Sequence, residues 1–367
     1  MATVGIDLGT TNSLVSVWQD DKCTLIPNNL GEYLTPSVVG IDENGEMLVG
    51  RTAKERLISH PESTVASFKR FMGTEKTFML GNRRFTAADL SSMVLRQLKE
   101  DAEKYLGEPV EEAVISVPAY FNDFQRNATK MAGELAGLTV ERLVNEPSAA
   151  ALAYRFGKTK EDQTFLVFDF GGGTLDISIV DAFDSVIEIV AVAGDNHLGG
   201  DDVNRAIAEK FLSVNRIDEG KITNEERASL IRESEKLKRT LTDAPEGEME
   251  VVIGGQIYQM KLDAKGLLEV SAKLLEGIGI PLKRAMNDSG YGNLTTTLSV
   301  TVIGESGISS VDNSQALMIY PNPVEQGTAV SVDLQEVSDA LLSVCRSDGV
   351  LVSRYRHIIL RCIGRQI

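Results

Sequence analysis

Residues 169–180 read "DFGGGTLDISIV" and place three consecutive glycines and a threonine after an aspartate. The residues that follow alternate between apolar and polar side chains, a pattern typical of a half-buried β-strand. Glycine lets the backbone turn tightly and approach a ligand closely, and N–H groups that point into one concavity bind phosphate without a positive side chain. The stretch therefore indicates a phosphate-binding turn between two strands, although a merely flexible glycine turn fits the same residues.

A second stretch has the same layout. Residues 5–18, "GIDLGTTNSLVSVW", also place an aspartate after an apolar residue, then a glycine-containing turn, threonines and an alternating strand. This repetition predicts two lobes of similar build. If the two turns face each other they form a nucleotide clamp, and Asp7 and Asp169 would hold Mg²⁺ through water, because this ion keeps much of its hydration shell. The matching pair of turns favours a clamp over two unrelated turns with solvated aspartates.

Composition limits the other classes of function. A chain of 367 residues, 43% of them apolar, has room for two or three domains with real cores. Its 53 acidic and 37 basic side chains give a net charge of −16, which disfavours broad attraction to nucleic acid or to anionic membranes. The three cysteines, Cys23, Cys345 and Cys362, lack metal-ligand spacing and are expected to be plain thiols. With no signal-peptide pattern and no membrane-length apolar run, the sequence predicts a cytoplasmic protein.

The order of periodic segments supports two α/β lobes. Strand-like alternation fills the first forty residues, and helical periodicity follows between Thr52 and Leu106. It is clearest in residues 89–107, "DLSSMVLRQLKEDAEKYLG", where Gly107 is placed to end the helix and apolar residues recur at four-residue steps, namely Leu90, Val94, Leu98, Ala102 and Leu106. Another helix is expected at 123–136, and strands return shortly before Asp169. After Tyr291 lysine disappears and short β-like runs rich in Thr, Ser and Val replace helices.

Eight motifs together resemble the ATPase domain of the 70-kDa heat-shock chaperone family (DnaK-type), within the actin-like superfamily. They are "GIDLGTTNS", "LIPN…GEYLTPSVV", "FKRFMG", "ISVPAYFNDFQR", "LVNEPSAAALAY", "FDFGGGTLDISIV", "GDNHLGG" and "EKLKRTL". They run in order from about Val4 to Tyr291. The segments "NSLVSVW", "LIPNNLGEYLTPS" and "KEDAEKYL" bring the chain closest to the bacterial C-type branch.

The resemblance implies a fold and a domain layout. It predicts a two-lobed, actin-like α/β ATPase fold with ribonuclease H-like lobes, an incomplete second lobe and a small all-β C-terminal segment. The expected boundaries are 1–155 for the first lobe, 156–292 for the second, 293–315 for a linker or replacement strand, and 316–367 for a β-rich tail.

The resemblance also assigns the phosphate and metal contacts, with ATP or ADP and Mg²⁺ as cofactors. It gives phosphate contacts to Gly9, Thr10, Thr11, Asn12, Gly171, Gly172, Gly173, Gly199 and Gly200. It gives the metal to Asp7, Asp169 and, through water, Glu146. It gives catalysis to Lys69, Glu146, Asp169 and Thr174.

Two of these assignments have plain structural alternatives. Lys69 would stabilise negative charge on the transferring phosphate and orient the attacking water. Composition alone would make it an exposed helix lysine. Glu146 would order magnesium-bound water, and it also suits the first turn of a helix, where an acid interacts well with the dipole. These two roles of Glu146 are compatible.

The resemblance places the adenosine on Glu235, Lys238, Arg239 and Thr242. The first three lie at i, i+3 and i+4 on one helix face, which a surface ion-pair helix would also show. It makes Pro118 and Arg126 a relay between nucleotide state and the peptide-binding part; without it, Pro118 would simply end a strand. A lone histidine, His197, beside the glycines at 199–200 is expected to be structural.

The family motifs are not recognised after Tyr291. The pattern calls for a strand and turn that close over the adenosine, a helix returning to the first lobe, a linker and a β-sandwich peptide-binding domain with a lid. The alternating run "TLSVTVIG" at 297–304 is a candidate for the missing strand. In the tail, "YPNPV", "AVSVDL" and the Asp348-Gly349 turn resemble the small β-sandwich sorting domains of the type IX secretion pathway.

Three functions follow from these observations. The first is the ATP-binding and ATP-hydrolysing domain of a heat-shock-70-like chaperone without its peptide-binding domain, with J-domain co-chaperones and nucleotide-exchange factors as partners. The second is a catalytically impaired regulator that binds nucleotide or co-chaperones, or a chimeric product of fusion or frameshift. The third is an exported surface protein, which rests only on the tail. The set Asp7, Lys69, Glu146 and Asp169 favours the ATPase.

Overall fold

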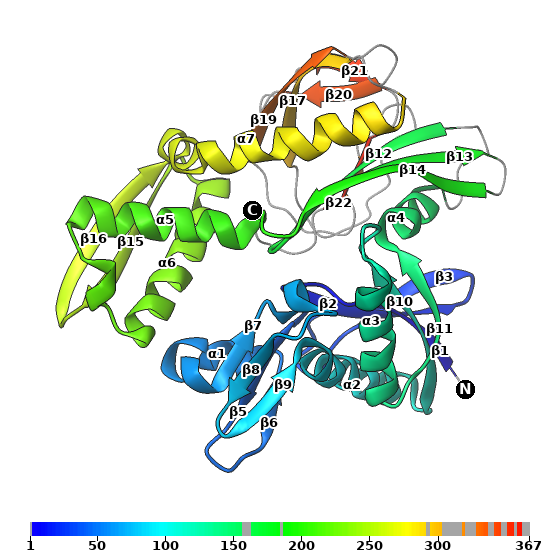
Figure 1. The fold of residues 1–367 in the computed structure, drawn as a ribbon, viewed down its shortest axis with the longest axis horizontal. Helices are drawn as coiled ribbons and strands as arrows, with labels where there is room; N and C mark the ends of the chain where they lie inside the picture. Colours follow the sequence, from blue (N-terminus) through cyan, green and yellow to red (C-terminus); the bar gives the residue numbers. More distant parts are fainter. Residues whose placement is uncertain are drawn as a thin grey trace. The chain divides into compact units, whose positions relative to one another are not determined.

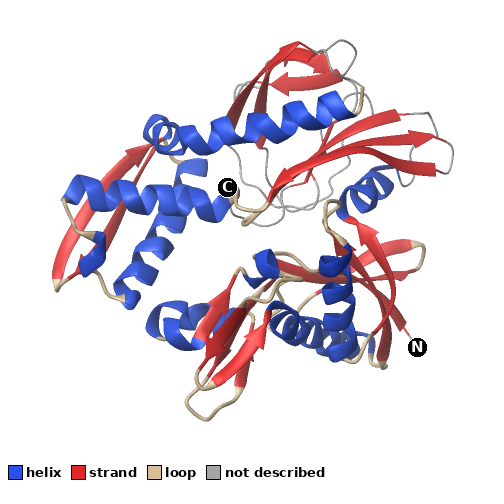
Figure 2. Cartoon of the chain, in the orientation of Figure 1, coloured by secondary structure: helices blue, strands red, loops and turns tan. Residues whose placement is uncertain are grey.

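The computed structural model describes residues 2–155, 163–183 and 186–290, and beyond these only the backbone of short strands between 294 and 361. The chain divides into two compact units, Met1–Glu146 and Pro147–Ile367. Figure 1 follows the sequence through both units, and Figure 2 shows that each combines strands with helices. The fold is therefore mixed α/β, as the sequence predicts.

The first unit is built on a mixed sheet with the strand order β11-β10-β1-β2-β3 and β4 paired to β2. Its strands are β1 (Ala2–Asp7), β2 (Asn12–Gln19), β3 (Lys22–Ile26), β4 (Thr35–Pro36), β10 (Val110–Val117) and β11 (Thr139–Asn145). Strand β1 pairs in parallel with β10 and antiparallel with β2, and β10 pairs in parallel with β11. The carboxyl ends of β1, β10 and β11 therefore meet at one edge of the sheet, where Asp7, Ser116 and Asn145 lie.

Two helices of the first unit begin with reciprocal side-chain caps. Helix α2 (Ala87–Leu106) starts at a Thr86–Asp89 capping box and ends at Gly107, whose φ of 71° is readily adopted only by glycine. Helix α3 (Asp123–Leu135) starts at an Asn122–Gln125 capping box. Helix α3 matches its predicted range to within one residue, and α2 ends where predicted and buries Leu90, Val94, Leu98 and Ala102 against the core. Between residues 64 and 86 the chain forms short strands and a 3₁₀ turn, so the helical periodicity expected from Thr52 onward is wrong in that part.

Shorter elements complete the first unit. A sheet of order β6-β5-β7 and a β8–β9 hairpin accompany one helix and two 3₁₀ turns. Their bounds are β5 (Val38–Ile41), β6 (Met47–Val49), β7 (Thr64–Ala66), β8 (Thr77–Leu80), β9 (Arg83–Thr86), α1 (Arg51–Ser59), η1 (Pro61–Ser63) and η2 (Phe68–Phe71).

The second unit opens with an antiparallel meander. Strands β12 (Gln163–Phe170), β13 (Leu175–Phe183) and β14 (Val186–Asp195) pair in order, and the glycine turn joins the first two. Helix α4 (Glu146–Arg155) starts at the last residue of the first unit and buries Ala150 and Ala151 against Phe165 and Val180 of this sheet.

A second core of this unit lies among three helices and a hairpin. The elements are α5 (Gly200–Asn215), η3 (Glu219–Lys221), α6 (Asn224–Asp243), β15 (Glu246–Ile253), β16 (Gln256–Asp263) and α7 (Ala264–Asp288). Figure 1 shows α5 and α6 beside the β15–β16 hairpin. Residues Phe211, Leu237 and Met249 are fully or almost fully buried there.

Six strands are described after residue 290: β17 (Leu294–Val302), β18 (Met318–Ile319), β19 (Thr328–Glu336), β20 (Leu341–Cys345), β21 (Leu351–Tyr355) and β22 (Ile358–Arg361). Strand β17, which contains most of the candidate replacement strand, pairs antiparallel with β19. The described strand beside β12 is β22, in parallel register. The "YPNPV" motif and the Asp348-Gly349 turn lie outside the described residues.

Candidate functional site

The first glycine turn is closed so tightly that only glycine fits at its start. A Cβ atom on Gly9 would lie 2.0 Å from the carbonyl oxygen of Asn12. Two residues on, the hydroxyl of Thr11 is buried and has no hydrogen-bond partner. A buried polar atom of this kind normally has a partner, so the turn suits a ligand that offers an acceptor or donor, as a phosphate group does.

Asp7 ends β1 immediately before this turn, and its carboxylate is buried and oriented by β10. The Ser116 hydroxyl donates to Asp7 Oδ1 at 2.6 Å, a distance typical of a charge-assisted bond. The parallel register pairs Asp7 with Ser116 directly. Ser116 belongs to the "ISVPAYF" motif but was absent from the predicted site, because a serine in an alternating strand gives no signal of its partner.

Lys69 and Glu146 form a buried ion pair. Lys69 Nζ lies 3.1 Å from Glu146 Oε1, and the two residues are only 6% and 5% exposed. The ammonium also lies 5.6 Å from the centre of the Phe121 ring. Lys69 sits in the 3₁₀ turn η2, which begins directly after Ser67, whose φ of 55° is left-handed. Lys69 is thus not an exposed helix lysine, and Glu146 does begin helix α4.

Arg126 ties the Pro118 loop to the residue that precedes Glu146. From α3 its guanidinium donates to the carbonyl oxygens of Ala119 and Phe121, at 3.1 and 2.8 Å, and to Asn145 Oδ1 at 2.7 Å. A displacement of this loop would therefore strain or break the hydrogen bond between Arg126 and Asn145. The geometry is compatible with the predicted relay role of Pro118 and Arg126.

In the second unit, the glycine turn packs directly on the start of α5. The Gly171 N–H donates to the Thr174 carbonyl, and the carbonyls of Gly171 and Gly172 accept from the N–H groups of Gly200 and Asp201. A Cβ atom on Gly199 would lie 2.6 Å from the backbone of Gly172. The two glycine segments that the sequence singled out, 171–173 and 199–200, are therefore in contact.

Two buried aspartates face each other beside this turn. The antiparallel register of β12 and β13 pairs Asp169 with Asp176, and both are almost fully buried. Asp169 was among the residues predicted from the sequence, and Asp176 was not. The signal was available, because a four-residue turn at 171–174 dictates that residues 169 and 176 oppose each other. Carboxylate oxygens are the protein ligands that Mg²⁺ prefers, so this pair fits a magnesium site.

Lys238 is buried beside the second of these glycine segments, residues 199–200. Its Nζ donates to the Gly200 carbonyl at 3.0 Å, and it is 2% exposed. Burial lowers the pKa of the ammonium from 10.5 to about 8, although Glu235 and Asp201 act in the opposite direction. The predicted surface ion-pair face is present only in part: Glu235 and Arg239 approach within 4.0 Å.

The remaining predicted residues fall within the two units. Thr242 is buried on α6, and His197 is exposed in a turn where its N–H donates to Asp195 Oδ1. No group of three or more His, Cys, Asp or Glu side chains able to hold a metal ion occurs among the residues that the structure describes. The two phosphate turns belong to different units, so their pairing as one clamp stays a prediction.

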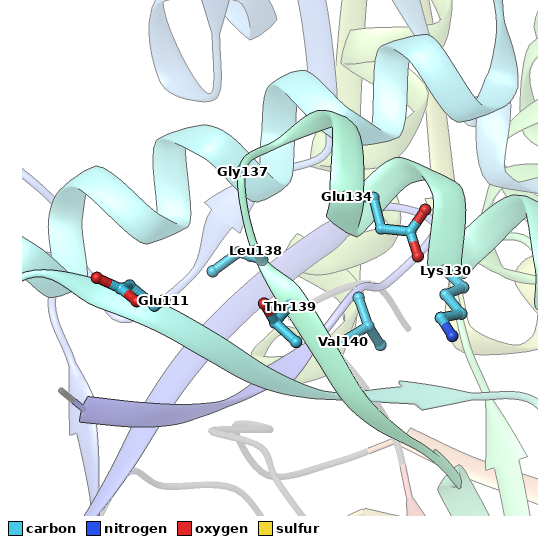
Figure 3. A pocket seen from close by; sticks show the side chains of 7 residues that line it. All are labelled: Glu111, Lys130, Glu134, Gly137, Leu138, Thr139 and Val140. Carbon is cyan, nitrogen blue, oxygen red and sulfur yellow. The ribbon is translucent and has the colours of Figure 1, made fainter.

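An open pocket of about 510 Å³ lies on the first unit, where α3, β10 and β11 meet (Figure 3). Its lining residues are Glu111, Lys130, Glu134, Gly137, Leu138, Thr139 and Val140. None of the residues predicted to contact nucleotide or metal lines it.

A comparison with known protein families decides the relationship. The family model of the Hsp70 protein matches residues 3–80 and 75–314, most of the chain. The chain belongs to the Hsp70 family. Family likeness continues past Tyr291, where the recognisable motifs end, so the resemblance extends further than the motifs predict. The matched region includes the chaperone nucleotide-binding domain, which is an ATPase in this family. No helix in the described part of the chain is long and apolar enough to cross a membrane.

Proposed function

We propose that this Hsp70 chain binds Mg-ATP and hydrolyses it, and that the residues described above form the site. The observation that carries the proposal is the buried Lys69–Glu146 pair in the same unit as an aspartate-flanked glycine turn. Backbone N–H groups of residues 9–12 and 171–174 would bind the phosphate oxygens. A phosphate oxygen would also give the Thr11 hydroxyl the partner that it lacks.

Magnesium, when bound, would neutralise part of the phosphate charge. Asp7, Asp169 and Asp176 are buried carboxylates at strand ends beside the two turns, and they would hold the ion through its water shell together with Glu146. Ser116 keeps Asp7 Oδ1 engaged and so limits the orientations of that carboxylate.

Lys69 is the residue that we assign to the chemical step. Its ammonium would stabilise the charge that develops on the terminal phosphate and orient the attacking water, while Glu146 fixes its position. Hydrolysis of this kind needs no covalent intermediate, because positioning and electrostatics supply most of the acceleration. Thr174 accepts the Gly171 N–H through its carbonyl and so closes the second turn, and we propose that it contacts the phosphates from that turn.

For the adenosine we propose the face of α6 that carries Glu235, Arg239 and Thr242. Lys238 is bound to the Gly200 carbonyl. We therefore propose that it joins this helix to the glycine segment at 199–200, so that adenosine and phosphate contacts depend on each other.

The finer assignments rest on the sequence motifs. We propose the bacterial C-type branch of the family, a cytoplasmic location, and J-domain co-chaperones and nucleotide-exchange factors as partners. Pro118 and Arg126 would relay the nucleotide state, which the three hydrogen bonds of Arg126 support. A catalytically impaired regulator is the alternative, and the experiment below separates the two.

Calorimetric titration with Mg-ATP and a steady-state ATPase assay test the proposal. We expect wild-type protein to bind and turn over ATP. Lys69→Ala should lower kcat by about 100-fold or more, the effect typical of losing one transition-state donor, with binding within a few-fold of wild type. Lys104→Ala, which removes an exposed lysine of α2, serves as the matched control and should change neither.

The outcomes divide the two functions clearly. Binding without turnover in the wild-type protein supports a nucleotide-binding regulator. The absence of heat at high micromolar Mg-ATP rejects the ATPase and the nucleotide-binding regulator, and leaves a regulator that binds only co-chaperones. An unchanged kcat in Lys69→Ala would reject the role assigned to this lysine.

A further inference from the structure

A closed ring of hydrogen bonds begins and ends on the peptide groups of Gly9. The Gly9 N–H donates to Ser13 Oγ at 3.1 Å, Ser13 Oγ lies 2.9 Å from Ser37 Oγ, and the Ser37 hydroxyl donates to the Gly9 carbonyl at 2.8 Å. Ser13 and Ser37 are each 1% exposed, so water does not compete for these bonds.

The protons of the ring can be ordered in only one way. Ser37 has a single hydroxyl proton and donates it in the hydrogen bond to the Gly9 carbonyl. In its contact with Ser13, Ser37 Oγ can therefore only accept. Ser13 in turn donates to Ser37 and accepts from the Gly9 N–H. Every donor therefore points the same way around the ring, an arrangement in which neighbouring bonds polarise and strengthen one another.

A backbone contact ties the same serine to the middle of the turn. The Ser37 N–H donates to the Thr11 carbonyl at 2.8 Å, and the flanking residues Thr35 and Pro36 pair with Ser13 and Asn12 in the β2–β4 ladder. The segment 35–37 thus fixes the turn at residues 9, 11, 12 and 13. Within this turn the Thr11 hydroxyl is buried without a partner, which indicates a ligand position.

We propose that Ser13 and Ser37 are positioning residues that preorganise the first phosphate turn. This inference rests on the proposed function. A turn that binds phosphate through its backbone has no long side chain to aim at the ligand, so its affinity depends on holding the peptide groups in one orientation before the ligand arrives. The ring fixes both the N–H and the carbonyl group of Gly9. No other residue type fits at this position, because a Cβ atom would collide with the Asn12 carbonyl oxygen.

Substitutions in the ring test this role. Ser37→Ala should weaken Mg-ATP binding about tenfold, the equivalent of losing one or two buried hydrogen bonds. Ser13→Ala should have a similar effect, and the double variant should lose no more than the larger single loss, because both substitutions open the same ring. Ser91→Ala is the matched control: Ser91 is fully buried in α2, its hydroxyl has no partner, and its loss should leave Mg-ATP binding unchanged.

Hydrogen exchange in the unliganded protein supplies a readout that does not depend on ATP. We expect amide exchange over residues 8–14 to accelerate about tenfold in Ser13→Ala, with urea stability measured alongside to separate local from global opening. Should Ser37→Ala fail to fold, Ser13→Ala still decides the matter, because it leaves both Ser37 contacts to the turn in place.

Each result has a definite meaning. Folded Ser37→Ala or Ser13→Ala protein with wild-type Mg-ATP affinity and unchanged exchange overturns the role of the ring while the proposed function stands. Additive losses in the double variant would overturn the single-ring arrangement. Wild-type protein that binds no Mg-ATP overturns the proposed function together with this inference.

Discussion

The buried ammonium of Lys238 makes a quantitative prediction about stability against pH. The side chain is 2% exposed, and burial lowers its pKa from 10.5 to about 8. The gap corresponds to roughly 3 kcal/mol, because a pKa difference of one is worth about 1.4 kcal/mol. In the unfolded chain the lysine is hydrated and regains its ordinary pKa, so the folded state alone bears this cost.

The direction in which stability changes with pH follows from the difference in bound protons between the unfolded and the folded chain. Between pH 8 and pH 10.5 the unfolded chain holds the proton and the folded chain has lost it. The Lys238 contribution to the free energy of unfolding therefore rises with pH through this window, and the charge destabilises the fold below it. Burial is the largest cause of the shift; Glu235, Asp201 and Asp202 act to raise the pKa of Lys238, and Arg239 acts to lower it.

Lys238→Met isolates the effect, because the side chain keeps a similar length and loses the charge. Urea unfolding of both proteins, followed by circular dichroism, gives the difference in free energy of unfolding at each pH. The free energy of unfolding of the variant minus that of wild type should fall by about 3 kcal/mol between pH 7 and pH 10.5. The lost bond to the Gly200 carbonyl shifts the whole curve but not its slope, since the neutral amine still donates. A difference that stays constant over this range would refute the reasoning.

Two further substitutions probe the metal side and the glycine contact. Ser116→Ala should remove the hydrogen bond that orients the Asp7 carboxylate and weaken Mg²⁺-dependent ADP binding about threefold to tenfold. Ser116→Thr should restore the affinity, and magnesium titrations in the presence of ADP measure this. Gly199→Ala should lower the free energy of unfolding by about 2 kcal/mol or more, because the added Cβ atom would collide with Gly172. Gly279→Ala in α7 should raise it by about 0.5 kcal/mol or more, because the space around Gly279 is open. Urea unfolding measures both. Equal effects of the two glycine substitutions would contradict this account.

Local patterns predicted the parts of the fold that depend on neighbours in sequence. The four-residue apolar steps of α2 and its end at Gly107 are confirmed, as are the start of α3 and the strand–turn–strand layout of residues 163–183. These features depend on helical period, caps and glycine turns, which a short stretch of sequence contains in full.

The contacts that make the candidate site were hidden because their partners are distant in sequence. Lys69 and Glu146 are 77 residues apart, and Ser13 and Ser37 are 24 apart. Nothing local distinguishes a lysine that will be buried by a remote glutamate from a lysine that will face water, so composition alone favoured the exposed alternative. The partnership of Ser116 and Asp7 depends likewise on the register of two parallel strands, which only the folded sheet sets.

The burial of Lys69 and Glu146 is better explained by function than by stability. Taking both charges out of water costs several kcal/mol for each ion, and a well-packed apolar pair of similar volume is often at least as stable. The same unit buries the Asp7 carboxylate just before the first glycine turn, and within that turn the Thr11 hydroxyl is buried without a hydrogen-bond partner. Unfavourable groups of this kind are expected where a ligand supplies the missing interactions. A polyphosphate with magnesium brings both the negative charge that Lys69 would meet and the positive charge that the carboxylates would meet.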